Sequence, residues 1–113
     1  MLLEIYILRL QTEMTAVSIP QGQTVSFGRR ETADICCDFD ERMTSIHFEI
    51  EHKGDVAEIR DLRSLSGTYL NDRLVKCSTP LHNGDTIRAG ITLFGVRLQE
   101  QMPETMHIQP VGG

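Results

Sequence analysis

The sequence predicts an all-β protein built as an antiparallel sandwich of two sheets. Apolar and polar residues alternate through most of the chain up to Glu100, and this period of two is typical of strands with one buried face. Turn residues separate these runs at intervals of about 8–12 residues, a spacing that favours sandwiches and barrels. No longer segment shows a convincing period of about 3.6 residues, so we expect almost no helix.

The first expected strand is Leu2–Leu10. An acid interrupts its apolar run, and neither a basic leader nor a small-residue cleavage site accompanies it, so a signal peptide is not expected. Pro20-Gln21-Gly22 should close one strand pair, and Lys53-Gly54-Asp55 should close a tight hairpin because glycine readily adopts positive φ. The other strands of this half are expected at Thr15–Ile19, Thr24–Gly28, Asp34–Cys37, Ile46–His52 and Val56–Asp61.

The second half of the chain continues the pattern as far as Glu100. Asn71-Asp72 should turn one hairpin, and Ala89-Gly90 should turn the last one. Beyond Glu100 the periodicity ends, and residues 101–113 contain two prolines and two glycines. We therefore expect one domain over residues 1–100, followed by a flexible C-terminal tail or the start of a linker. The strands of this half are expected at Thr68–Leu70, Arg73–Lys76, Asp85–Arg88 and Thr92–Glu100.

Composition restricts the possible classes of function. The 113 residues, of which 40 % are apolar, suffice for one hydrophobic core. The formal net charge of −5 argues against nucleic-acid binding. No apolar run approaches the roughly 20 residues that span a bilayer. We therefore expect a protein without nucleic-acid or membrane partners.

The three cysteines, Cys36, Cys37 and Cys77, cannot form a closed disulfide framework. Cys36 and Cys37 alternate across an expected strand, so one should be buried and the other exposed. No zinc-ligand spacing joins the cysteines to the four histidines. The residues thus indicate reduced thiols in a cytoplasmic protein, with no metal and no cofactor.

Four blocks of polar residues fall between the expected strands. The first is Gly28-Arg29 and the last is Leu81–Gly90, with Arg42–His47 and Ser64–Asn71 between them. A β scaffold that gathers arginine and hydroxyl side chains in loops at one end is suited to holding a phosphate, because guanidinium is a permanently charged fork of donors. In order and spacing, these blocks resemble the forkhead-associated domain, a reader of phosphothreonine peptides. The resemblance covers roughly Val25 to Leu98.

This resemblance implies a sandwich of the SMAD/FHA type and a role in protein–protein recognition and signalling, not in catalysis. The ligand would be a phosphothreonine-containing protein or peptide whose phosphate oxygens bind Arg29 and Thr44. Other matched positions would maintain the architecture of the loops, namely Gly28, His47, Gly67, Thr68 and Asn71. The peptide-contacting positions that the resemblance implies are Arg29, Arg42, Thr44, Ser45, Leu65 and Ser66.

Four of these positions depart from the family pattern, and one of them, Leu65, stands where the family has a small or polar residue. Thr44 replaces a serine conservatively, whereas Ser45 replaces an arginine or asparagine, and Ser66 replaces the asparagine that grips the peptide backbone. Loss of one or two buried hydrogen bonds at Ser66 would weaken binding by roughly 2- to 100-fold. These weakened positions keep a second hypothesis open, a phosphate-independent scaffold domain in a larger assembly, for example in bacterial secretion or signalling.

Several of these residues also have structural interpretations. Arg42 could form a surface salt bridge with Asp40 or Glu41, and Thr44 could bond its own backbone in a turn. Catalysis would need a nucleophile such as Cys37 beside His47, but the two fall on different expected strands with no motif around them. The partner, the kinase and the oligomeric state stay open at this point.

Overall fold

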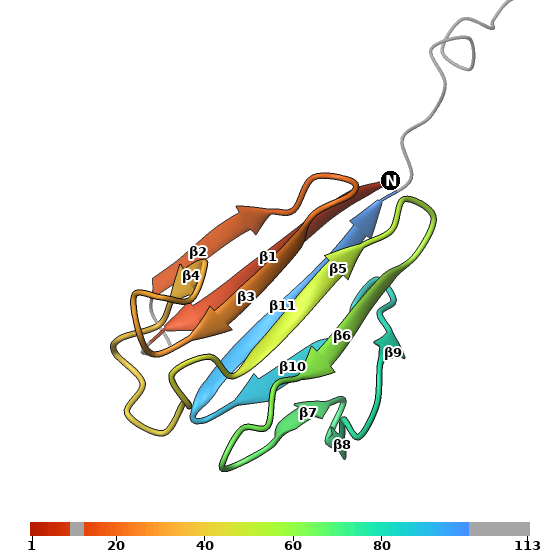
Figure 1. Cartoon of the computed structure of the whole chain (residues 1–113). Helices are drawn as coiled ribbons and strands as arrows, with labels where there is room; N and C mark the ends of the chain where they lie inside the picture. The colour runs from red at the N-terminus through yellow and green to blue at the C-terminus, as the bar shows by residue number, and fades with distance from the viewer. Residues whose placement is uncertain (10–12, 100–113) are drawn as a thin grey trace, which may run out of the picture.

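A computed structural model describes residues 1–9 and 13–99 of the chain. The described residues form two packed sheets and contain no helix (Figure 1), which confirms the all-β sandwich. One sheet has six strands in the order β2-β1-β11-β10-β7-β8, and the other has five in the order β4-β3-β5-β6-β9. Within this part of the chain, accordingly, no helix could cross a membrane. The strands are β1 Leu2–Arg9, β2 Glu13–Ser18, β3 Thr24–Gly28, β4 Ile35–Cys36, β5 Phe48–His52, β6 Ala57–Asp61, β7 Thr68–Leu70, β8 Arg73–Leu74, β9 Thr79–Pro80, β10 Thr86–Ala89 and β11 Thr92–Gln99.

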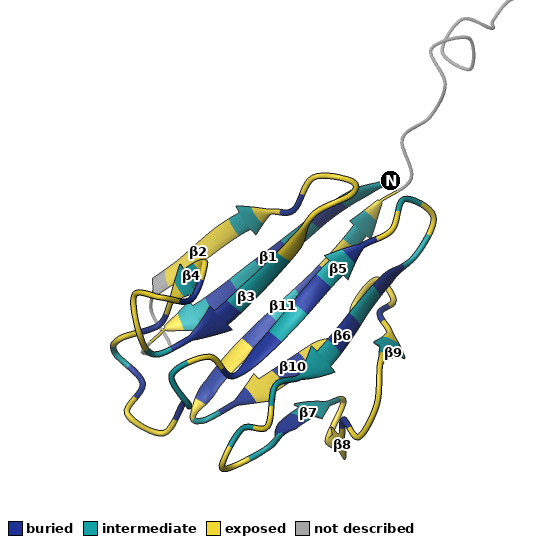
Figure 2. Ribbon diagram, viewed as in Figure 1, coloured by how far each residue is buried: buried dark blue, intermediate teal, exposed yellow. Residues whose placement is uncertain are grey.

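Strand β1 shows how the alternating sequence builds these sheets. Leu3, Ile5 and Ile7 are buried, while the residues between them are partly exposed, as expected for a strand with one face on the core. β1 pairs in antiparallel register with β2 and β11, and Ile5 lies opposite both Val17 and Val96. The apolar faces of the two sheets thus meet in one core, which Figure 2 shows as the buried positions along the strands.

Three phenylalanines occupy the centre of this core. Phe27 stacks on Phe48 with ring centroids 4.7 Å apart, and Phe94 meets both rings edge-on at 5.6 and 5.2 Å. Offset-stacked and edge-to-face contacts are the favourable arrangements of aromatic rings. Nearby, Cys37 is buried and Cys36 is exposed, which confirms the expected alternation of the two neighbouring cysteines.

Most of the expected strands are confirmed, with ends that shift by one or two residues. Asp85 lies outside β10 because its carboxylate accepts a hydrogen bond from the His82 backbone N–H at 2.7 Å and so closes the preceding turn. Ile46 lies outside β5 because the His47 ring holds this segment in a loop. The last turn falls at Gly90-Ile91, one residue later than expected. The expected strand ends at residues 10 and 100 and the tail over 101–113 lie outside the described residues.

Two features of the sheets correct the sequence-based expectation. Thr79–Pro80 forms β9, which pairs with β6. Proline argues against a strand, but β9 lies at the sheet edge, where the missing N–H does not interrupt the ladder. The pairing of β3 with β4 is parallel, not antiparallel, because the loop of residues 29–34 carries the chain back before β4 begins.

Four connections lie at one end of the sandwich, opposite the N-terminus (Figure 1). They are the β3–β4 loop (residues 29–34), the β4–β5 loop (residues 37–47), the β6–β7 loop (residues 62–67) and the β10–β11 turn (residues 90–91). The first three contain the candidate ligands that the sequence predicts.

Candidate functional site

Gly28, the last residue of β3, allows two loops to approach each other closely. A Cβ atom at this position would collide with the Ser45 carbonyl oxygen, so only glycine fits. Because of this approach, the Arg29 N–H donates to the Thr44 carbonyl at 3.1 Å and the Arg30 N–H donates to the Ser45 carbonyl at 3.2 Å. The β3–β4 and β4–β5 loops are thereby joined, and Arg29 and Thr44 become neighbours.

The Arg29 side chain is held through only one of its nitrogens. Its Nε donates to the Met43 carbonyl oxygen at 3.2 Å, and the residue is half-buried. In the described part of the chain, its two terminal nitrogens have no protein partner. The backbone therefore orients a guanidinium whose two remaining donor groups are available to an anion.

The Thr44 hydroxyl joins this arginine to a third loop. Thr44 Oγ1 accepts a hydrogen bond from the Leu65 N–H at 2.9 Å, so the expected alternative, a turn threonine bonding its own backbone, does not describe the contact. Since a hydroxyl is both donor and acceptor, its proton stays available for an outside acceptor. Arg29 and Thr44 thus present free donors from adjoining loops.

The His47 ring connects the β4–β5 loop to the β6–β7 loop. The residue is fully buried, its Nδ1 accepts the Thr44 N–H at 3.0 Å, and its Nε2 lies 2.9 Å from the Gly67 carbonyl oxygen. The neutral ring with its proton on Nε2 satisfies both contacts at once. Both ring nitrogens therefore serve the backbone of the loops.

The β6–β7 loop is organised around the Asp61 carboxylate. This carboxylate accepts hydrogen bonds from the Ser64 N–H at 3.1 Å, the Ser64 hydroxyl at 2.6 Å and the Thr68 hydroxyl at 2.7 Å. Burial alone would raise the pKa of Asp61, but the hydrogen bonds from Ser64 and Thr68 outweigh burial and lower this pKa below its usual value. Gly67 completes the loop with a φ of 89°, a backbone conformation that favours glycine.

The tip of this loop carries the two residues expected beside the peptide. Leu65 is 94 % exposed, so its side chain projects into solvent. The Ser66 hydroxyl lies 3.4 Å from the Arg42 carbonyl oxygen, which is long for a hydroxyl donor and therefore weak. Ser66 is exposed, and this contact places it beside the β4–β5 loop, which also carries Thr44.

Asp40 has a role that the sequence interpretation missed. Its side chain is fully buried and accepts the Arg42 N–H at 2.9 Å, the Ile91 N–H at 2.9 Å and the Thr92 hydroxyl at 2.6 Å. It therefore ties the β4–β5 loop to the β10–β11 turn and is not a surface partner for the Arg42 guanidinium. No local pattern marks this role, because the turn lies about fifty residues later in the chain.

Arg42 and Arg63 are exposed arginines of the same loops. Within the described residues, neither guanidinium has an ion pair or hydrogen bond to the protein. Ser45 is half-buried beside them, and its carbonyl accepts the Arg30 N–H.

Asn71 is not brought into this cluster. It lies at the β7–β8 turn with a φ of 50°, at the end of β7 away from the β6–β7 loop. Its amide donates to the Asp85 carboxylate at 2.9 Å and accepts the Thr86 N–H at 2.9 Å. Asn71 thus connects the β7–β8 turn to the start of β10.

The Cys37 and His47 pair does not have the chemistry of a catalytic dyad. Burial, with smaller contributions from Cys36 and the nearby aspartates, raises the pKa of Cys37 to about 12, so the thiol stays protonated near neutrality. Both nitrogens of His47 already have backbone partners. Among the described residues, no group of three His, Cys, Asp or Glu side chains could hold a metal ion.

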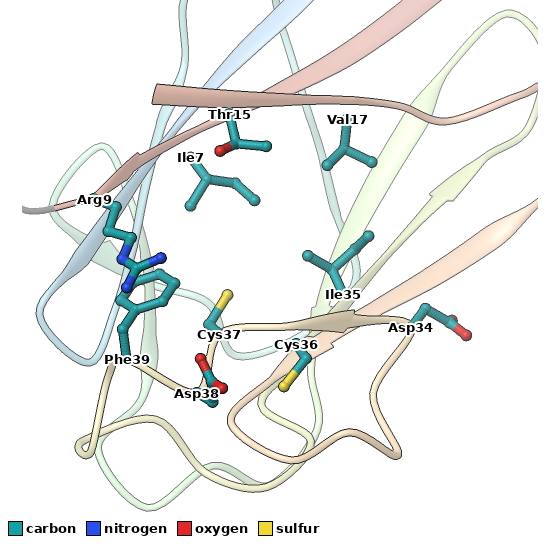
Figure 3. Close-up of a pocket in the computed structure, with 10 residues that line it drawn as sticks. All are labelled: Ile7, Arg9, Thr15, Val17, Asp34, Ile35, Cys36, Cys37, Asp38 and Phe39. Atoms are coloured by element: carbon teal, nitrogen blue, oxygen red, sulfur yellow. The ribbon is translucent and has the colours of Figure 1, made fainter. Parts of the chain in front are cut away.

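Cys37 lines a separate open hollow, where the edge strands β2 and β4 of the two sheets approach each other (Figure 3). Thr15 and Val17 point into it from β2, and the Arg9 guanidinium lies 4.6 Å from the centroid of the Phe39 ring. Its lining includes neither Arg29 nor Thr44. The hollow is therefore distinct from the loop cluster that carries the candidate phosphate ligands.

Comparison with known proteins identifies relatives of this arrangement. A family model described as the FHA domain matches residues 25–90, more than half of the chain. An oxoglutarate dehydrogenase inhibitor from Corynebacterium jeikeium is 41 % identical over 68 residues, which are 60 % of this chain and 46 % of that relative. The matched region therefore spans less than half of the length of this curated relative.

Solved structures share the fold. A structure from an analysis of phosphothreonine-dependent FHA domain interactions has a TM-score of 0.80 and 26 % identity, and covers 89 % of this chain and 100 % of its own. The FhaA FHA domain, solved with the intracellular domain of a second protein, has a TM-score of 0.74 and 27 % identity over 84 % of this chain and 99 % of its own. An FHA domain from Chlamydia trachomatis has a TM-score of 0.82 at 20 % identity, covers 88 % of this chain and 100 % of its own, and shows the fold alone.

Proposed function

This chain belongs to the FHA domain family, and from that membership we propose that it binds phosphothreonine-containing segments of partner proteins through its loop cluster. FHA domains are protein-interaction modules and not enzymes. The mechanism is equilibrium recognition, without a chemical step. The partner is a protein or peptide carrying the modification, and the three free thiols of the chain favour a reducing, cytoplasmic setting for such signalling.

The observation that carries this proposal is the pairing of Arg29 with Thr44. The Arg29 backbone donates to Thr44, its Nε is occupied by the Met43 carbonyl, and its terminal nitrogens have no partner among the described residues. The Thr44 hydroxyl retains its proton for an outside acceptor. A phosphoryl group with about −1.5 to −2 charges and three acceptor oxygens matches this set of donors.

The remaining positions would contact the peptide around the phosphothreonine. Ser45 can add one hydroxyl donor, and Ser66 partly replaces the missing amide toward the peptide backbone. The Arg42 guanidinium, which has no protein partner in the described residues, would meet an acidic side chain of the peptide, and Leu65 adds apolar surface. Burial of the threonine γ-methyl would favour phosphothreonine over phosphoserine by about 0.8 kcal/mol.

Substitution of Arg29 tests the proposal. A charge-assisted hydrogen bond contributes about 1.5–3 kcal/mol, so Arg29→Ala should weaken phosphothreonine-peptide binding by roughly 10- to 150-fold in calorimetry. Thermal stability should change little, because only the Nε contact to Met43 is lost within the protein. Arg30→Ala is the matched control, since Arg30 is exposed in the same loop and should leave the affinity unchanged. Equal affinities of the wild type and Arg29→Ala would refute the assignment.

A phosphate-independent scaffold is the second candidate function. The short side chains at Ser45 and Ser66 and the exposed Leu65 favour it, because a scaffold interface rests on apolar contact and not on phosphate ligands. A degenerate phosphothreonine peptide library, titrated beside its unphosphorylated twin, separates the two functions. Equal binding of both libraries, or binding of neither, would select the scaffold.

A further inference from the structure

The backbone of Arg63, in the β6–β7 loop, adopts a conformation that arginine rarely takes. Its φ is 58°, in the left-handed region, where any side chain crowds the following carbonyl group. Among the described residues other than glycine, only Asn71 and Asp72 share a positive φ, and asparagine and aspartate tolerate this region in turns. Arg63 is therefore the unusual residue of the three.

Hydrogen bonds on both sides of Arg63 hold this conformation. The Leu62 N–H donates to the His47 carbonyl at 2.9 Å, and the Asp61 carboxylate accepts both the N–H and the hydroxyl of Ser64. All of these contacts belong to neighbours of Arg63, so a residue that tolerates positive φ would serve the same loop with less strain. The architecture of the loop thus does not explain an arginine at this position.

The side chain of Arg63 does not compensate for the strain within the protein. The residue is exposed, and in the part of the chain that the structure describes its guanidinium has no hydrogen bond or ion pair. Arg60, three residues earlier, donates instead to Glu49 and Glu51. Strained residues that the surrounding structure holds in place concentrate at ligand-binding sites, so the strain at Arg63 points to a ligand outside the chain.

Arg63 lies beside the segment of the β4–β5 loop that carries Thr44. One contact between the two loops joins Leu62 to the His47 carbonyl. The next joins the Leu65 N–H to the Thr44 hydroxyl at 2.9 Å. The residues between these two contacts, Arg63 among them, therefore run alongside the end of the β4–β5 loop.

Arg29 borders the same segment on its opposite side, because the Arg29 N–H donates to the Thr44 carbonyl. Thr44 thus lies between two loops, each of which carries an arginine. Hydrogen-bonded neighbouring segments lie about 4.8 Å apart, so a group bound over the Thr44 hydroxyl is within reach of long side chains from both loops. Ser45, on the middle segment, has a short side chain that brings no charge to this group.

We propose that Arg63 is a second guanidinium ligand of the phosphate, an inference that rests on the recognition function proposed above. A phosphoryl group carries about −1.5 to −2 charges near neutral pH and has three acceptor oxygens. Arg29 balances only part of this charge, and the Thr44 hydroxyl balances none. With Arg63, two guanidinium groups approach the phosphate from the loops on either side of Thr44, and the Thr44 proton serves the remaining oxygen.

The test is calorimetry of the full chain with the degenerate phosphothreonine peptide library and its unphosphorylated twin. Arg63→Asn removes the charge and tolerates the positive φ, so it should weaken binding of the phosphorylated library about tenfold. The urea midpoint of this variant should not fall, because no contact within the described protein is lost. Arg63→Lys keeps the charge and should retain more of the wild-type affinity than Arg63→Asn.

Arg73→Ala is the matched control, because it removes the same charge from an exposed position of β8, and it should keep the wild-type affinity. Unchanged affinity of Arg63→Asn, in a protein whose binding requires Arg29, would overturn this inference and leave the recognition function standing. A lower urea midpoint of Arg63→Asn, or an equal loss of affinity in Arg63→Lys, would assign Arg63 to the structure of the loop and also overturn the inference. A wild type that does not bind the phosphorylated library would overturn the recognition function together with it.

Discussion

Arg29 and Thr44 each divide their hydrogen-bonding capacity between the protein and the solvent. The Arg29 Nε donates to a carbonyl of the protein, so the two terminal nitrogens are left for a ligand. The Thr44 hydroxyl oxygen accepts a hydrogen bond from the protein, so the hydroxyl proton is left for a ligand. Such side chains are preorganised, because the internal bond fixes the direction of the free donor before a ligand arrives. Ser66 lacks this property, since its only contact is a long one to the Arg42 carbonyl.

At Ser66, an asparagine should improve the site. Its amide would offer a donor and an acceptor to the peptide backbone, and each new hydrogen bond contributes about 0.5–1.5 kcal/mol. Ser66→Asn should therefore tighten phosphothreonine-peptide binding by roughly 2- to 100-fold in calorimetry. Ser66→Ala serves as the control and should not gain affinity. If Ser66→Asn binds no better than the wild type, the β6–β7 loop does not contact the peptide, and the scaffold function gains support.

The loops form one structural unit because buried polar side chains connect them. His47 joins the β4–β5 loop to the β6–β7 loop, and Asp40 joins the β4–β5 loop to the β10–β11 turn. Each connection satisfies backbone N–H or C=O groups that have no ladder partner, as buried backbone requires. The two loops and the turn are thereby held as one unit at one end of the sandwich.

Loss of the Asp40 carboxylate should destabilise this unit. Asp40→Ala leaves the buried Thr92 hydroxyl without its acceptor, at about 1–3 kcal/mol, and also removes the acceptor of the Arg42 and Ile91 N–H groups. The free energy of unfolding in urea should therefore fall by about 3 kcal/mol. Glu41→Ala, at the exposed neighbouring position, should change it by no more than about 0.5 kcal/mol. An Asp40→Ala variant as stable as Glu41→Ala would contradict the anchoring role.

The β6–β7 loop should lose stability in acid. The pKa of Asp61 lies below its ordinary value of 3.8 in the folded protein, so the unfolded chain takes up a proton first as pH falls. The stabilising contribution of Asp61 is therefore complete above pH 3.8 and is lost as pH falls through the lower folded pKa. Urea unfolding should show a large difference between the wild type and Asp61→Asn at pH 6 and a smaller one near pH 3. A difference that does not depend on pH would mean that the carboxylate charge is irrelevant to the loop.

Over the whole molecule, a net charge of −5 coexists with arginines gathered in the loops at one end. The two are compatible because charges act over a Debye length of only about 8–10 Å. The acidic residues that pair with Arg60 lie on the outward face of the five-stranded sheet, whereas Arg29, Arg42 and Arg63 lie in the loops at one end. A ligand that reaches the loops therefore meets the local charge and not the net charge.

Binding of a native partner should depend on phosphate and on salt. A partner captured from the native proteome should be released by phosphatase treatment, because the charges that bind Arg29 are removed with the phosphoryl group. The affinity for a phosphothreonine peptide should also fall as salt rises, since screening weakens exposed charge contacts. Retention after complete dephosphorylation, with little sensitivity to salt, would instead establish the scaffold function.

The sequence alone determined the fold class and most strands, and it predicted the residues of the candidate site. This was possible because strand periodicity, turn chemistry and the polar blocks are local properties, read over a few neighbouring residues. Even so, β9 was missed because Pro80 argues against a strand when its position at a sheet edge is unknown. The parallel pairing of β4 was missed for a related reason, since pairing depends on where the preceding loop returns the chain.

The tertiary structure alone decided which of these residues act together. Asp40 lies about fifty residues from Ile91 and Thr92, and Thr44 about twenty from Leu65. Contacts of this kind have no signal in the intervening sequence, because they arise only when two sheets pack and bring their loops to one end.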